Sequence, residues 1–181
     1  MALAMQLYLV RHAKARPKKG WKGSDADRPL DDKGFWQAPK IAESILESGR
    51  GREITAIYSS PSLRCQQTLE PLAGKLSLGV EARVLLGDTK SGPPAPIDAE
   101  ETPASRLLGL RGLFFVDDCA HLHAGEAIAA CSHGDLIPGA VAMLCERDGV
   151  ELPDNGNDKG SIWTLEFDGP RLKKASYAGA P

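Results

Sequence analysis

Almost wholly apolar runs at three places along the chain predict buried strands. They cover residues 6–10, 54–58 and 127–131. Runs without regular polar alternation are typical of strands that are covered on both faces of a sheet. A weaker run at 80–86 predicts a further strand. Two last runs, 162–167 and 172–177, bracket Asp168-Gly169 and predict a hairpin or an edge pair.

Between these strands, apolar residues recur at helical spacing. Residues 32–48 have this pattern, and Pro39 inside it is expected to kink the helix or delay its regular start. Ser60-Pro61 predicts another helix start, with Ser60 as N-cap and Pro61 at the first helical position. Further helices are expected over about 104–115 and after His133. The alternation predicts an α/β fold, a three-layer sandwich around a mostly parallel, mixed sheet.

Length and charge narrow the class of protein. A chain of 181 residues suits one domain, expected over residues 1–181, and 42% hydrophobic with 25% charged residues is typical of a globular protein. The net charge of -2 gives no overall basic field, so neither a nucleic acid polymer nor a membrane surface is an expected partner. The sequence leaves the oligomeric state open.

Short apolar segments and scattered cysteines favour a cytoplasmic protein. The stretch 1–10 is too short to span a bilayer and lacks the basic start of a secretory signal. Cys65, Cys119, Cys131 and Cys145 form no C-x-x-C pair, so reduced, buried thiols are expected, with no bound metal.

Charged and polar residues follow each of the three buried strands directly. Arg11-His12 follows the first, residues 59–64 with Arg64 follow the second, and Ser132-His133 follow the third. In open α/β sheets, ligands bind beyond the carboxyl ends of strands, so these clusters are expected to meet in one crevice. Two arginines, two histidines and helix N-termini around one point would suit a phosphate group.

Four segments in this order resemble the motifs of the histidine phosphatase superfamily, which has the phosphoglycerate mutase-like fold. They are Leu9-Val10-Arg11-His12-Ala13, Arg28-Pro29-Leu30-Asp31 with Gly34, Ser59-Ser60-Pro61 with Arg64 and Thr68, and Ser132-His133-Gly134. Together they cover most of the chain.

This resemblance implies a role for each catalytic candidate. His12 would be the nucleophile and carry the phosphoryl group as phosphohistidine. Arg11 and Arg64 would hold the phosphate oxygens, and His133 would stabilise charge in the transition state. The reaction would need neither a metal nor another cofactor, because arginines and histidines supply the positive charge.

The chain departs from the family pattern where the carboxylic acid is usually found. Residues 85–92 lack the family's Trp-Glu-Gly element, which points to the short branch of the superfamily. Asp88 is the first candidate for the acid, with Glu81, Glu100 and Glu101 behind it. The proline-rich region 87–103 is expected to form a long loop or lid.

A second resemblance concerns the C-terminal part and the basic insert at 14–28. Residues 145–150, 159–163 and 168–169 look like the histidine phosphatase domain found behind a Nudix hydrolase domain in proteins that act on nucleotides and dinucleoside polyphosphates. Lys22 and Arg28 are therefore further candidates for binding the substrate. Trp21 would either stack on a base or be partly buried in a solvated lysine loop.

We therefore expect a hydrolase that removes phosphate from small phosphorylated molecules, nucleotides or related metabolites, through phospho-His12. A phosphatase of phosphohistidine proteins and a non-catalytic phosphate-binding module remain the alternatives. His121 and His123 lie in a separate polar stretch, and both are expected to be exposed.

Overall fold

One mixed β-sheet forms the centre of the described structure. The computed structural model describes residues 4–49, 52–88 and 104–181. Within these ranges six strands pair in the order β3-β2-β4-β1-β5-β6. They are β1 (Gln6–Arg11), β2 (Ile54–Ser59), β3 (Val80–Ala82), β4 (Ala127–Ser132), β5 (Ile162–Asp168) and β6 (Arg171–Ala178). The first four are mutually parallel, whereas β5 runs antiparallel to β1 and β6 runs antiparallel to β5.

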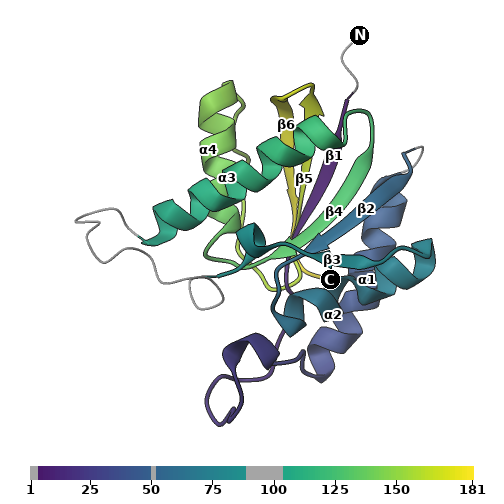
Figure 1. The fold of residues 1–181 in the computed structure, drawn as a ribbon, viewed down its shortest axis with the longest axis vertical. Helices are drawn as coiled ribbons and strands as arrows, with labels where there is room; N and C mark the ends of the chain where they lie inside the picture. Colours follow the sequence, from purple (N-terminus) through teal and green to yellow (C-terminus); the bar gives the residue numbers. More distant parts are fainter. Residues whose placement is uncertain (1–3, 50–51, 89–103) are drawn as a thin grey trace.

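Helices cover both faces of this sheet (Figure 1). On one face, α1 (Asp32–Ser48) and α2 (Leu63–Leu76) enclose a core with one set of strand side chains. On the other face, α3 (Ala104–Leu122) and α4 (Ile137–Asp148) enclose a second core. Two 3-10 turns, η1 (Asp25–Asp27) and η2 (Val84–Leu86), lie in the connections. All six residues of β4 are buried, as the continuous apolar run predicts for a strand between two helical layers.

The structure confirms the predicted helix over 32–48 and the C-terminal pair of strands. α1 begins after Asp31, whose carboxylate accepts a hydrogen bond from the Gly34 amide at 2.9 Å, and it accommodates Pro39. The β5–β6 pair is an antiparallel hairpin with Gly169 at positive φ in its turn. All four cysteine thiols are free and buried, as predicted.

Three element boundaries were predicted wrongly. α2 begins at Leu63 after Ser62, so Ser60 does not cap it; the Ser60 hydroxyl instead hydrogen-bonds with His133 at 2.8 Å. The strand predicted over 80–86 ends at Ala82, and the chain turns through η2 to bury Leu86. The helix predicted over 104–115 continues to Leu122, because buried residues such as Val116 extend its apolar face.

Among the helices that the structure describes, none combines the length and apolar character needed to cross a membrane.

Candidate active site

The carboxyl ends of β1, β2 and β4 meet at one edge of the sheet, as expected of a parallel arrangement. An open pocket of about 240 Å³ lies there, and it is strongly polar. It is lined by Arg11, His12, Lys18, Asp25, Arg28, Arg64, Asp88, His133, Gly134, Asp135 and Lys159. The structure thus brings the four predicted catalytic residues together with Arg28 and Asp88.

His12 is held as a neutral imidazole in a defined orientation. Its Nδ1 lies 2.7 Å from the Ala13 carbonyl, which can only accept, so Nδ1 carries the proton and Nε2 keeps its lone pair. Burial lowers the pKa of His12 to about 3; the positive charge of neighbouring His133, Arg64 and Arg11 acts in the same direction, and the hydrogen bond to Ala13 opposes it. A neutral imidazole with a free Nε2 is the form required of a nucleophile.

Thr68 joins the end of β1 to helix α2. Its hydroxyl accepts a hydrogen bond from the Ala13 amide at 3.0 Å and donates one to the Arg64 carbonyl at 2.7 Å. The His12 amide is fixed as well, because it donates to the Ser132 carbonyl at 3.0 Å. These bonds set the positions of His12 and Arg64 relative to each other.

Two guanidinium groups line the pocket: Arg64 is buried, whereas Arg11 is partly exposed. Arg64 donates to the Asp25 carbonyl at 2.6 Å and to the Asp88 carboxylate at 3.0 Å, and Arg11 donates to the Asn157 carbonyl. Within the described part of the chain, the buried Nε atoms of Arg11 and Arg64 have no hydrogen-bond partner. An unsatisfied buried donor is costly, and an oxyanion in the pocket would supply the missing acceptors.

Gly134 allows the Arg11 guanidinium to reach this place. A Cβ atom at residue 134 would lie 2.5 Å from Cζ of Arg11, closer than any real contact. The Ser132-His133-Gly134 segment therefore supplies a histidine and also leaves room for the arginine.

His133 has the opposite electrostatic character to His12. Its Nε2 lies 2.8 Å from the Ser60 hydroxyl, and its Nδ1 lies 3.7 Å from the Asp88 carboxylate. Burial favours the neutral ring, but neighbouring Cys65 and Asp88 outweigh it and raise the pKa of His133 above its ordinary value. The two rings lie 5.4 Å apart, centroid to centroid. The pocket thus pairs a neutral histidine with one that favours a proton, a separation typical of sites with distinct acid and base roles.

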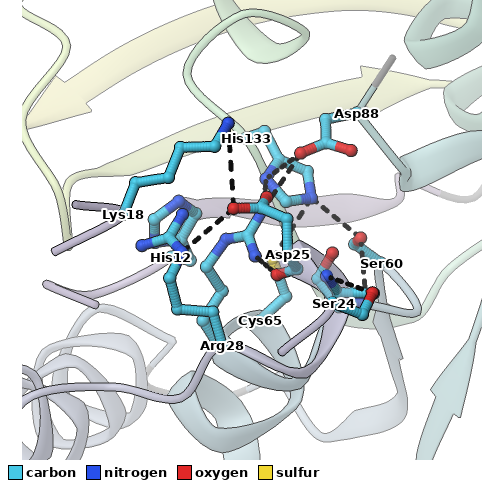
Figure 2. A network of polar contacts seen from close by, with 12 residues as sticks. His12, Lys18, Ser24, Asp25, Arg28, Ser60, Cys65, Asp88 and His133 are labelled. Carbon is cyan, nitrogen blue, oxygen red and sulfur yellow. Dashed lines mark hydrogen bonds and ion pairs between the residues drawn. The ribbon is translucent and has the colours of Figure 1, made fainter. Parts of the chain in front are cut away.

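Asp25, which matches none of the sequence motifs, enters the pocket from η1. Its carboxylate lies 3.0 Å from Arg28, 3.2 Å from Arg64 and 3.8 Å from Lys18, and Figure 2 shows it beside Arg28 and Lys18. Burial tends to raise the pKa of Asp25, but its hydrogen bond with Arg28 and the nearby positive charges lower it overall. A phosphate group would compete with this carboxylate for the same cations. The one sequence feature that indicates a position near the phosphate pocket is its place in the basic insert, before Arg28-Pro29.

The remaining candidates are placed differently. Lys22 is exposed and does not line the pocket, whereas Lys18 and Lys159 do. Glu81 is exposed and pairs with Arg83 at 2.9 Å, away from the pocket. Glu100, Glu101 and most of the predicted 87–103 loop lie outside the described residues.

Trp21, His121 and His123, whose surroundings were also predicted, lie outside the residues that line the pocket. Trp21 is half-buried, and its indole N–H donates to the Ser24 carbonyl at 2.8 Å. His121 is exposed as predicted, but His123 is not fully exposed, because it hydrogen-bonds with Tyr58 at 2.7 Å and pairs with Glu126. Across the described ranges, no three His, Cys, Asp or Glu side chains cluster in a way that could hold a metal ion.

Comparison with known proteins identifies the family. Residues 7–106 match the sequence profile described as Histidine phosphatase superfamily (branch 1), and the chain belongs to this superfamily. An 8-oxo-(d)GTP phosphatase from Mycolicibacterium smegmatis (strain ATCC 700084 / mc(2)155) is 31% identical over 173 residues, which is 96% of this chain and 48% of that protein. The chain thus spans about half the length of this relative.

Solved structures agree on the fold. The Bacillus stearothermophilus protein YhfR superposes with a TM-score of 0.70 at 21% identity, over 93% of this chain and 94% of that one. The protein histidine phosphatase SixA, complexed with tungstate, gives a TM-score of 0.61 at 21% identity, over 97% of this chain and 96% of that one. At this level of identity the likeness speaks for the fold alone, which is the predicted phosphoglycerate mutase-like α/β fold.

Proposed function

We propose that the protein hydrolyses phosphate esters of small molecules, nucleotides or related metabolites, through a phosphohistidine intermediate on His12. The observation that carries this proposal is the 2.7 Å contact between His12 Nδ1 and the Ala13 carbonyl, in a pocket lined by Arg11, Arg64 and His133. This contact assigns the proton to Nδ1 and leaves Nε2 as the nucleophilic nitrogen. The nucleotide class draws on the relative named as an 8-oxo-(d)GTP phosphatase.

In the first step, the Nε2 lone pair of His12 attacks phosphorus while the bond to the leaving oxygen breaks. Arg11 and Arg64 bind the non-bridging oxygens, and their free Nε donors match an oxyanion. His133 contributes positive charge as charge builds up on the oxygens. The Ala13 carbonyl accepts from Nδ1–H and so stabilises the cationic ring that forms.

The leaving oxygen needs a proton, and Asp88 is the carboxyl group that we propose as its donor. Asp88 would take up this proton when the substrate phosphate binds Arg64 in place of the Asp88 carboxylate. Asp88 lines the pocket and lies beside Arg64 and His133, whereas Glu81 is outside. In the second step, water attacks phosphorus, the N–P bond breaks, and the proton of the water passes to the Asp88 carboxylate. The products are orthophosphate and the alcohol or shorter phosphate.

The test is a substrate panel on three proteins: wild type, His12→Ala and His121→Ala. The panel holds an aryl phosphate, nucleoside mono-, di- and triphosphates, a diadenosine polyphosphate and a phosphohistidine protein. His121→Ala is the matched control, since His121 is an exposed histidine outside the pocket. We expect wild type and the control to hydrolyse nucleotides and His12→Ala to retain less than about 1% of the rate.

Other outcomes would contradict this proposal in distinct ways. Selective action on the phosphohistidine protein would favour the phosphoprotein alternative. No turnover of any substrate would favour a phosphate-binding module. His12→Ala with the wild-type fold by circular dichroism and more than about 1% of the rate would remove His12 as the nucleophile.

A further inference from the structure

A second cavity adjoins the candidate active site, and four of its ten lining residues are cations. Its volume is about 520 Å³, against about 240 Å³ for the pocket around His12. Its charged lining consists of Arg11, Lys14, Lys33, Lys159 and Asp158, joined by Gln37, Asn157 and residues 179–181. We call this cavity the lysine groove. Arg11 and Lys159 line both cavities, so the lysine groove continues the catalytic pocket.

Close backbone packing brings Lys14 and Lys33 to the groove. Gly34 lies against the chain at Lys14 so tightly that a Cβ atom at residue 34 would be 2.0 Å from the Lys14 carbonyl oxygen. The Asp31 amide also donates to this carbonyl at 3.0 Å. The start of α1, which carries Lys33, is therefore fixed against the segment that follows His12.

Lys159 is placed by the end of β1 and by a buried amide. The Gly160 amide donates to the Arg11 carbonyl at 3.1 Å, which holds Lys159 beside Arg11. Gln37 is 2% exposed; its Oε1 accepts from the Lys14 amide and its Nε2 donates to the Lys159 carbonyl, each at 3.0 Å. Because Gln37 ties both lysine-bearing segments together, the arrangement of the cations is set before any ligand arrives.

The groove carries more positive charge than its own carboxylates neutralise. Lys14 pairs with Asp31 at 3.4 Å, but Lys33 and Lys159 form no salt bridge with any residue in the described ranges. Burial lowers the pKa of Lys159, and repulsion from Arg11, Arg28 and Lys14 lowers it further. Mutual repulsion of this kind is relieved by an anion with several negative charges.

We propose that the lysine groove binds a second anionic group of the substrate, the phosphates that remain on the leaving group of a nucleoside di- or triphosphate or a related polyphosphate. The proposal rests on the proposed function in one respect, that the phosphate to be transferred lies at His12. Arg11 would then contact both the transferred phosphate and its neighbour. Single-phosphate esters would use the catalytic pocket alone and bind less tightly.

Direct binding separates this proposal from the question of catalysis. All proteins carry His12→Ala, so that no ligand is consumed, and orthophosphate and tripolyphosphate are titrated by calorimetry at low salt. We expect tripolyphosphate to bind at least about tenfold more tightly than orthophosphate, with a preference that shrinks as salt rises. Adding Lys33→Glu should reduce the ratio of the two affinities about fivefold or more.

Lys33 is a suitable probe because it is exposed in the first turn of α1, where an acidic residue favours the helix. Lys40→Glu is the matched control: Lys40 lies on the same helix, over the Trp36 ring, and does not line the groove. The control should leave the ratio unchanged.

Equal affinities for the two anions would overturn the proposal. An equal reduction of the affinity ratio in Lys33→Glu and Lys40→Glu would also overturn it, because it would indicate only a general effect of net charge. These results do not depend on turnover. If the groove shows no preference for tripolyphosphate but the wild-type protein hydrolyses nucleotides, only the second binding site is refuted. If the groove binds tripolyphosphate but the wild-type protein hydrolyses no substrate, only the proposed reaction is refuted.

Discussion

The neutral state of His12 makes a quantitative prediction about stability and pH. An unfolded histidine has a pKa of about 6.5, whereas burial lowers the pKa of His12 to about 3 in the folded protein. Between these values the unfolded chain binds a proton that the folded protein excludes. The free energy of unfolding therefore falls as pH drops below about 6.5, by up to about 1.36 kcal/mol for each pH unit.

From pH 7.5 to pH 5.0, this linkage amounts to about 2 kcal/mol. The full value applies because His12 is only 7% exposed, which leaves little solvent to screen the effect. The assay is urea unfolding of wild type and His12→Asn at several pH values in this range. Asparagine can keep a donor to the Ala13 carbonyl but cannot titrate.

We expect wild type to lose about 2 kcal/mol more than His12→Asn over this range. The imidazole resonances of His12, followed by NMR, should show no titration above about pH 4. A difference between the two proteins that is constant with pH, or a His12 ring that titrates between pH 5.5 and 7.5, would refute the reasoning. His12 would then be cationic through much of that range and would lack the lone pair needed for attack.

Three further substitutions test the site and its support. Gly134→Ala should displace the Arg11 guanidinium and lower kcat/KM about 10- to 100-fold with little change in the urea midpoint; an unchanged kcat/KM would contradict the contact. Asp88→Asn should slow hydrolysis of substrates with poor leaving groups about 100-fold more than that of aryl phosphates, and equal effects on both would exclude Asp88 as the acid. Gly34→Ala should destabilise the fold by about 3 kcal/mol in urea unfolding, because its Cβ would overlap the Lys14 carbonyl, and wild-type stability would show that the backbone can give way.

The sequence predicted correctly those element boundaries that depend on residues nearby in the chain. Helix α1 follows the pattern over 32–48 because Asp31 caps it and its apolar face is regular. Ser60 has the composition of an N-cap, yet its hydroxyl contacts His133, which lies 73 residues further along the chain. A pairing over that distance overrides local propensity, and α2 begins later.

The same distinction applies to the site. Arg11, His12 and His133 directly follow apolar runs, so the parallel order of strands brings them together. Asp25 and Lys159 have no such signal. Asp25 reaches the pocket through its bonds to Arg64, and Lys159 through the antiparallel approach of β5 to β1. Both contacts join segments that are distant in the sequence, and no hydrophobic periodicity marks the residues that make them.

The phosphoenzyme is the most direct test of the central claim. Wild-type protein is mixed with a nucleotide substrate that it hydrolyses, quenched in base within milliseconds, digested and analysed by mass spectrometry. We predict a phosphate that is labile in acid and stable in base, located on His12 and absent from His12→Ala. Turnover without a phosphoenzyme, or a phosphate on any other residue, would contradict nucleophilic catalysis by His12.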